Sequence, residues 1–160
     1  MPRIAITGHS NLTPDTAGLV RAALGRELGR YDPGGLVGVT CLARGADQVF
    51  ARAVLDLGGA VEVVLPAADY RARKVGADNA VEFDALLGAA ASVVTLPFPE
   101  SNRDAYLAAS EHVLDSAEAV LAVWDGRPAD GRGGTGDVVE AARARGLPVT
   151  VVWPEGAERG

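Results

Sequence analysis

Six short apolar runs, separated by stretches with helical spacing, constrain the fold of this chain more than any other feature. The runs cover residues 3–7, 36–40, 61–65, 92–96, 119–124 and 147–153. They are continuous rather than alternating in polarity, which is typical of strands buried on both faces of a parallel sheet. Because parallel neighbours need a crossover connection, the alternation of runs and helices predicts an α/β domain.

The helices between these runs carry recognisable start signals. Thr13 and Pro14 predict an N-cap and a first helical position, for a helix that extends to about Arg30. Ser101 and Asp104 have the spacing of a capping box, which predicts a later helix start. Residues 69–75 carry Tyr70, Arg71, Arg73 and Lys74, and we interpret them as a solvated basic patch, with a lid over an anion as the alternative.

The chain of 160 residues has the length of one domain of the usual ~100–200 residues. We predict one Rossmann-like domain over residues 1–154, followed by a frayed tail at 155–160. Its six-stranded sheet should be mostly parallel, in the order 3-2-1-4-5-6, with helices on both faces. Four loops would then meet at the carboxyl ends of the strands, namely 8–12, 41–47, 97–103 and 125–136.

A glycine-rich stretch at 131–136 lies between the fifth apolar run and an alanine-rich helical pattern. Glycines let the backbone approach a ligand, and the first turn of a helix offers unpaired N–H groups to an anion. This order therefore indicates a nucleotide-type site. The alternative is a surface loop, since Asp137 and Glu140 also fit a capping box that needs no function.

Composition excludes several classes of function. Fifteen basic and twenty-one acidic residues give a net charge of −6, which argues against general nucleic-acid binding. No run approaches the ~18 apolar residues of a membrane span, and the first strand follows Met1 so closely that we expect a cytoplasmic protein. With Cys41 as the single cysteine and His9 far from His112, neither a disulfide nor a metal site is expected, and no cofactor is predicted.

Three segments resemble motifs of one group of proteins. Residues 40–47 are similar to a G-L-A-R-G-x-D signature. Phe98-Pro99 together with Asn102-Arg103 is similar to F-P-x-R-N-R. Residues 133–140 are similar to P-G-G-x-G-T-x-x-E. The chain thus resembles the SLOG superfamily, which takes its name from the DNA-processing protein DprA and the LOG-type phosphoribohydrolases. Each motif follows a predicted strand in the expected order, so the resemblance covers most of the chain.

The resemblance implies a set of site residues. The ligand contacts that it implies are Gly8, His9, Ser10, Arg44, Gly45, Asp47, Asn102, Arg103, Gly133, Gly134, Thr135 and Gly136. If the chain is an enzyme, it implies Glu140 as the catalytic carboxylate, supported by Asp137 and Arg103. Arg132 and Asp137 depart from the LOG motif, which has proline and threonine at these positions.

Asp137 supports a separate inference about where a phosphate binds. A carboxylate at a helix start repels a phosphate about 4 Å away by roughly 1–4 kcal/mol. We therefore expect the phosphate near Arg44 or Arg103, with Asp137 accepting hydrogen bonds from a ribose diol. The alternative is that Asp137 is the N-cap of its helix.

Two aromatic residues end predicted strands at the same edge. His9 would stack on a base or contact a phosphate there, or else only fill space. Trp124 would form a wall of a base pocket or the edge of the core, and we place its neighbour Asp125 among the ligand contacts.

Three functions remain open at this point. The first is a small module that binds a nucleotide or nucleotide derivative, and the second is an enzyme that cleaves the N-glycosidic bond of a nucleoside monophosphate. The third, DprA-like binding of single-stranded DNA, is disfavoured by the net charge. We expect a small-molecule ligand and a homo-oligomer, and neither a nucleic-acid nor a membrane partner.

Overall fold

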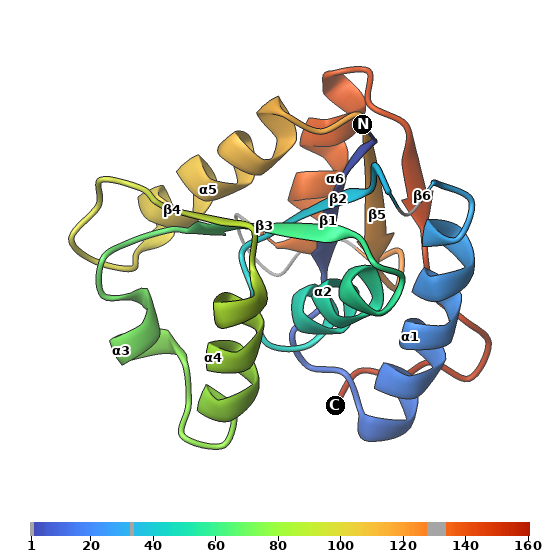
Figure 1. The fold of residues 1–160 in the computed structure, drawn as a ribbon, viewed down its shortest axis with the longest axis horizontal. Coiled ribbons are helices and arrows are strands. Elements are labelled where there is room, and N and C mark those ends of the chain that lie inside the picture. Colours follow the sequence, from blue (N-terminus) through green and yellow to red (C-terminus); the bar gives the residue numbers. More distant parts are fainter. Residues whose placement is uncertain (1, 33, 128–133) are drawn as a thin grey trace.

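The computed structural model describes residues 2–32, 34–127 and 134–160, in which strands alternate with helices (Figure 1). The strands are β1 (Arg3–Gly8), β2 (Val37–Thr40), β3 (Ala60–Leu65), β4 (Ser92–Thr95), β5 (Ala119–Val123) and β6 (Val149–Val151). The helices are α1 (Pro14–Leu28), α2 (Ala46–Asp56), α3 (Tyr70–Lys74), α4 (Ala80–Ala89), α5 (Arg103–Asp115) and α6 (Thr135–Ala144). Each predicted apolar run overlaps one of these strands, and β1 and β3 each extend one residue beyond their runs.

The strands of the described residues form one sheet in the order β4-β3-β2-β1-β5-β6, and every neighbouring pair is parallel. The predicted α/β domain with a parallel six-stranded sheet is therefore confirmed. The predicted order was wrong in one respect, because β4 lies at the edge beside β3 instead of between β1 and β5.

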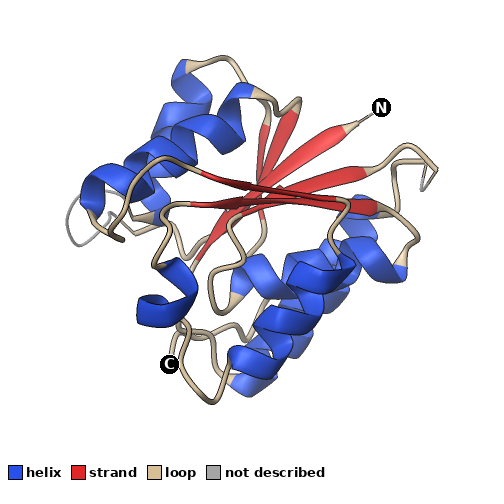
Figure 2. Cartoon of the chain, turned by 60° about the vertical axis from the view of Figure 1, so that its left-hand side comes forward, coloured by secondary structure: helices blue, strands red, loops and turns tan. Residues whose placement is uncertain are grey.

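The position of β4 follows from the faces that the helices cover. Helices α1, α2 and α4 pack together on one face of the sheet, and α5 and α6 lie on the other (Figure 2). Because βαβ crossovers are right-handed, helices on the first face extend the sheet from β1 through β2 and β3 to β4. Helix α5 then crosses the opposite face and returns the chain to the other side of β1, where β5 and β6 follow.

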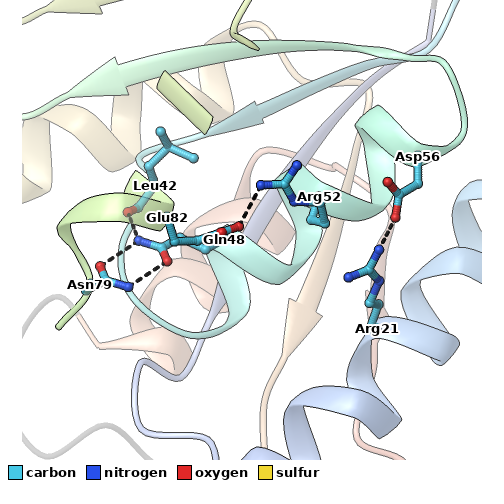
Figure 3. Close-up of polar contacts among 7 residues, drawn as sticks. All are labelled: Arg21, Leu42, Gln48, Arg52, Asp56, Asn79 and Glu82. Atoms are coloured by element: carbon cyan, nitrogen blue, oxygen red, sulfur yellow. Dashed lines mark hydrogen bonds and ion pairs between the residues drawn. The ribbon is translucent and has the colours of Figure 1, made fainter. Parts of the chain in front are cut away.

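Helix α2 is the centre of the first layer. Its Asp56 pairs with Arg21 of α1, and its Arg52 donates to Glu82 of α4 at 2.9 Å (Figure 3). Beneath these surface pairs, Phe50 of α2 is completely buried among apolar side chains of the sheet and its neighbouring helices. Both surface pairs connect α2 to its neighbours, and the buried face holds the layer on the sheet.

Burial differs between the central and edge strands. All four residues of β2 are buried, as the continuous apolar runs predicted. All four residues of β4 are exposed, and Val93 and Val94 retain 44% and 42% of their accessible surface. The prediction of a sheet covered on both faces therefore holds at the centre and fails at β4, where the side chains on both faces of the strand remain exposed.

Helix starts agree with the sequence signals only in part. Thr13 caps α1 as predicted, and its hydroxyl oxygen accepts a hydrogen bond from the Thr16 N–H at 3.2 Å. The N-cap of α5 is Asn102 and not Ser101, and the N-cap of α6 is Gly134 and not Asp137. In both cases the helix begins at a different residue from the one that the capping-box pattern indicated.

Residues 155–160, expected to fray, instead pack against the loop after β1 and the start of α1. Arg159 forms a β-bridge with Leu12, and its Nε donates to the Asn11 side-chain oxygen at 3.0 Å. The Glu158 N–H donates to the Thr16 hydroxyl oxygen at 2.7 Å. Local sequence held no signal for this docking, because its partners are more than 140 residues away. Among the described residues, none of the helices combines the length and apolarity needed to cross a bilayer.

Candidate functional site

A cavity of about 410 Å³ lies at the carboxyl ends of four neighbouring strands. Its lining includes Pro66 after β3, Cys41 after β2, Gly8 at the end of β1 and Trp124 after β5. Because adjacent strands are about 4.8 Å apart, these positions span roughly 14 Å along the edge of the sheet. The cavity thus includes the junction of β1 and β5, where the connections change face, and open α/β sheets commonly bind ligands at such a point.

Two glycines allow β1 and α2 to approach each other closely at the centre of this edge. A Cβ on Gly8 would lie 2.8 Å from the Val123 Cβ, and one on Gly45 would lie 2.6 Å from the His9 carbonyl oxygen. Gly45 also has a φ of +84°, a conformation that side chains other than glycine rarely adopt. Both glycines are therefore required by packing within the protein, and of the two only Gly8 lines the cavity.

His9 connects the loops that follow β1 and β5. Its backbone N–H donates to the Val123 carbonyl and its Nε2 accepts from the Asp125 N–H, each at 3.1 Å. Its ring packs edge-on against Trp153, with a centroid distance of 5.6 Å. Burial lowers the pKa of His9, and the positive charge of Arg159 lowers it further, against a smaller opposite effect of the Asp125 carboxylate. We therefore treat the 3.4 Å approach of Nε2 to the Asp125 carboxylate as a contact of a neutral ring with its proton on Nδ1.

Asp47 organises the loop after β2. It is 8% exposed, and its Oδ2 accepts from the Thr40 hydroxyl at 3.1 Å and from the Cys41 N–H at 3.3 Å. Burial raises the pKa of Asp47 to about 6, although these hydrogen bonds and one from the Ala43 N–H oppose the rise. At neutral pH the carboxylate is mainly ionised, so this part of the lining carries negative charge.

A pair of side-chain amides holds the same loop in place. The Gln48 Nε2 donates to the Leu42 carbonyl at 3.1 Å and to the Asn79 Oδ1 at 2.9 Å, and the Asn79 Nδ2 donates back to the Gln48 Oε1 at 2.9 Å (Figure 3). Leu42 has a φ of +55°, which is uncommon outside glycine. These hydrogen bonds offset the cost of that conformation and join the loop to the start of α4.

Tyr70 of α3 and Tyr106 of α5 line the cavity where it reaches β3, and together with Asp47 they form what we call the tyrosine end. The two tyrosine rings are 6.4 Å apart and nearly perpendicular. Tyr70 is 6% exposed, and burial raises its pKa, with the charge of Asp47 adding to the effect. The Asp69 carboxylate, which accepts from the Ser101 N–H and hydroxyl at 2.7 Å each, connects the segment before α3 to the segment before α5.

Positive charge gathers where the cavity reaches β5 and α6. Arg127, Arg159 and residues 134–136 line this part, which we call the arginine end. Residues 134–136 are the N-cap and first positions of α6, whose early N–H groups have no partner within the helix. The Asp125 carboxylate lies 3.6 Å from the Arg159 guanidinium and accepts from the Arg127 backbone N–H at 3.0 Å. Burial favours a raised pKa for Asp125, but the hydrogen bond from the Arg127 N–H and the positive charge of Arg159 oppose this, and the pKa lies below its usual value.

The structure brings half of the predicted site residues together. Those that line the cavity are Gly8, His9, Ser10, Asp47, Gly134, Thr135 and Gly136. Among the described residues, those outside the lining are Arg44, Gly45, Asn102, Arg103, Asp125, Asp137 and Glu140. Gly133 falls outside the residues that the structure describes.

The two arginines at which we expected a phosphate do not line the cavity. The Arg44 guanidinium makes a bidentate contact with the Asp78 carboxylate, at 3.0 and 2.6 Å, in an exposed position. Arg103 is exposed in the first turn of α5. Asp137 and Glu140 are likewise exposed, on α6. The direction of the Arg44 side chain depends on a partner 34 residues away, which its local sequence does not reveal.

Among the described lining residues, the sequence analysis missed six polar side chains, namely those of Thr7, Tyr70, Tyr106, Ser110, Arg127 and Arg159. Arg127 lies in the loop 125–136, which we had expected at this edge, so its position was the signal that could have found it. The sequence places Tyr70 in a segment that we interpret as a solvated patch, with a lid over an anion as the alternative, and it gives no site signal for Tyr106. Arg159 had no local signal, because it reaches the cavity through the docking of the C-terminal segment. Cavities built from distant segments are not visible in local patterns.

No protein-family model matches the sequence, and no curated protein matches it. In structure, the chain is similar to DprA from Streptococcus pneumoniae, with 19% identity, 98% of this chain and 52% of that chain covered, and a TM-score of 0.71. It is also similar to DprA from Helicobacter pylori, which is described for its single-stranded DNA binding mode. The two chains are 20% identical, the match covers 99% of this chain and 68% of that chain, and the TM-score is 0.69.

A third similar structure is the molybdenum cofactor binding protein from Rippkaea orientalis. The two chains are 17% identical, the match covers 96% of this chain and 77% of that chain, and the TM-score is 0.61. The chain spans about half the length of the Streptococcus DprA chain. At these identities the similarity shows a shared fold. That fold is consistent with the resemblance to the SLOG superfamily found in the sequence motifs.

Proposed function

We propose that this chain is a cytoplasmic binding protein for a nucleotide or nucleotide derivative, held in the cavity at the carboxyl edge of the sheet. The observation that carries the proposal is a cavity of about 410 Å³ with its arginines at one end. This volume lies within the roughly 300–1,000 Å³ of small-molecule sites. A ligand with an anionic group at one end would fit this distribution of charge.

The arginine end offers the contacts that a phosphate needs. Guanidinium groups donate paired hydrogen bonds to phosphate oxygens, and the first turn of a helix adds backbone N–H groups and the positive end of its dipole. Arg127 and Arg159 are both exposed enough to turn toward a ligand. Asp125 competes for Arg159, but their 3.6 Å pair is partly solvated and such pairs are weak.

The similar structures support a ligand site on this fold. DprA from Helicobacter pylori is described for its single-stranded DNA binding mode, and the Rippkaea protein is described as a molybdenum cofactor binding protein. For this chain a small molecule is the better proposal, because its net charge of −6 opposes the electrostatic attraction that DNA binding requires. Affinity for single-stranded DNA that falls steeply with added salt would favour the DNA alternative.

The second candidate is hydrolysis of an N-glycosidic bond, with Glu140 as the carboxylate and Asp137 and Arg103 in support. All three side chains are exposed and outside the cavity lining, so no observation favours this reaction over binding. Incubation with AMP and GMP, followed by chromatography for free base, tests it directly. Release of base that is lost in Glu140→Gln would establish the enzyme and its carboxylate.

The expected homo-oligomer is a separate proposal. The exposed valines of β4, Val93 and Val94, and the open edge of that strand are the apolar surface that supports it. Light scattering coupled to size-exclusion chromatography measures the mass in solution, and a monomer at all concentrations would contradict the proposal.

A thermal-shift panel of AMP, GMP, ADP-ribose and NAD tests the binding function. A ligand at about 100 times its Kd stabilises the folded state by about 2.7 kcal/mol, which for a domain of this size corresponds to roughly 5–10 °C. Arg127→Ala should remove most of the shift, whereas Arg26→Ala, an exposed arginine of α1 outside the lining, should leave it unchanged. The proposal fails if no compound of the panel shifts the transition, or if both variants respond like the parent.

A further inference from the structure

The hydroxyl of Tyr70 has no hydrogen-bond partner among the described residues, although Tyr70 is 94% buried, with 6% of its surface exposed. No fully buried polar side-chain atom of the described residues lacks a partner. The hydroxyl therefore keeps some accessible surface, and the cavity that Tyr70 lines is the open space beside this residue. A buried hydroxyl that meets only a cavity is available to a ligand, because a bound group can replace the water that would otherwise solvate it.

The neighbours of this hydroxyl disfavour an anion. Burial raises the pKa of Tyr70, and the charge of Asp47, which lines the same end, adds to this effect, so the phenol remains protonated and can donate. The arginines of the lining, Arg127 and Arg159, belong to the opposite end, where the cavity reaches β5, three strands away from β3. A phosphate placed beside Asp47 would meet like charge with no compensating arginine from the lining. The tyrosine end thus suits an uncharged, flat group.

We propose that Tyr70 and Tyr106 bind the heterocyclic base of the ligand, with the Tyr70 hydroxyl donating to a ring acceptor and Tyr106 contacting the ring face. This inference rests on the proposed function, since it requires a phosphate at the arginine end. The cavity then accepts a purine nucleoside monophosphate in one orientation, base toward β3 and phosphate toward α6. Tyr70 and Tyr106 determine specificity for the base, and the arginines bind any ligand with the same anionic group.

Trp124 offers the competing position for a base. It lines the cavity at the end of β5, and its indole N–H donates to the Arg127 carbonyl at 2.8 Å. Its polar group is therefore already satisfied within the protein, whereas that of Tyr70 is not. This difference favours the tyrosine end, where a base acceptor would complete the hydrogen bonding of the site.

Calorimetric titration with AMP, GMP, IMP and ribose 5-phosphate separates the two ends. The parent protein should bind at least one purine monophosphate about 10- to 100-fold more tightly than ribose 5-phosphate, which lacks the base. Tyr70→Phe should weaken binding of that purine monophosphate about tenfold and leave ribose 5-phosphate unchanged. Tyr106→Leu should reduce the preference further, provided that its thermal transition shows a folded protein.

The matched control is Tyr31→Phe, which removes the hydroxyl of the one remaining tyrosine, outside the cavity lining. It should bind every probe like the parent. Equal affinity for ribose 5-phosphate and the purine monophosphates would overturn the inference and leave the proposed function standing. Selective loss of base binding in Trp124→Leu but not in Tyr70→Phe would also overturn it. Failure of all four probes to bind would overturn the inference, while a thermal shift with ADP-ribose or NAD would leave the proposed function standing.

Discussion

The tyrosine end and the arginine end of the cavity are built in different ways. At the tyrosine end, Asp47 and Tyr70 are 8% and 6% exposed, and hydrogen bonds hold the adjoining loop. At the arginine end, Arg127 is exposed and the Arg159 side chain retains 41% of its surface. One end is part of the core, and the other is made of surface side chains and a docked terminal segment.

This difference teaches how such a cavity divides affinity and specificity. Buried groups with few rotamers can select a shape, because changing their position disturbs the packing around them. Exposed arginines contribute attraction that tolerates many geometries and is screened by salt. The tyrosine end should therefore respond to mutation mainly in stability and selectivity, and the arginine end mainly in overall affinity.

The largest effect should come from Gly45→Ala, where α2 meets the loop after β1. The new Cβ would lie 2.6 Å from a backbone oxygen at a φ of +84°, so strain and overlap together should cost about 3 kcal/mol or more. Gly58→Ala is the matched control, because Gly58 has a φ of +85° with open space around its Cβ position, and should cost about 1 kcal/mol. Urea denaturation measures the free energy of unfolding of both variants. Equal losses of stability would contradict the close packing around Gly45.

The next effect is the dependence of stability on pH through Asp47. Its pKa in the folded protein, about 6, lies above the ordinary 3.8, so the folded state binds the proton more tightly. Its contribution to stability is therefore greatest below about pH 4 and is lost as the pH rises to about 6, by roughly 3 kcal/mol. Asp47→Asn should lack this loss.

The measurement is the free energy of unfolding of parent and Asp47→Asn between pH 4 and 7. Lost or altered hydrogen bonds in the variant add an offset that does not change with pH, so the slope of the difference is the test. The difference should move in favour of the variant as the pH rises. Parallel curves would show that Asp47 is not a buried, ionising group.

A smaller effect is expected at the arginine end. Arg159→Ala should lower the affinity for AMP and for ribose 5-phosphate by the same factor, because one charge-assisted contact is lost. The factor should be about tenfold at low salt and smaller at high salt. Arg26→Ala serves as the exposed control, and titration calorimetry at two salt concentrations measures both variants. A change in the ratio of the two affinities would mean that Arg159 also contacts the base.

The smallest effect is the coupling between the two ends. In a double-mutant cycle, the changes in AMP-binding free energy caused by Tyr70→Phe and by Arg159→Ala should add to within about 0.5 kcal/mol. Sites more than 7–10 Å apart without shared partners act independently. Four affinities, for the parent, the two single variants and the double variant, give the coupling energy. A value well above 1 kcal/mol would show that the ends do not act as separate sites.

Much of the fold was predictable from local sequence. The apolar runs placed all the strands because burial on both faces leaves a continuous apolar pattern, and Thr13 with Pro14 located the start of α1. The order of strands was not predictable, since the pattern of β4 does not record which face α4 packs on. That choice depends on contacts between α2 and α4 and on the handedness of the crossover.

By itself the sequence determined a parallel sheet, the elements around it and the edge at which its glycine loops meet, because these depend on local periodicity and turn chemistry. Only the tertiary structure decided which side chains face the cavity. Arg44 is held by Asp78, 34 residues away, while Arg159 reaches the cavity because its segment docks beside Leu12. A side chain is directed by partners that the fold brings close, and those distances in space are not written in the spacing of residues along the chain.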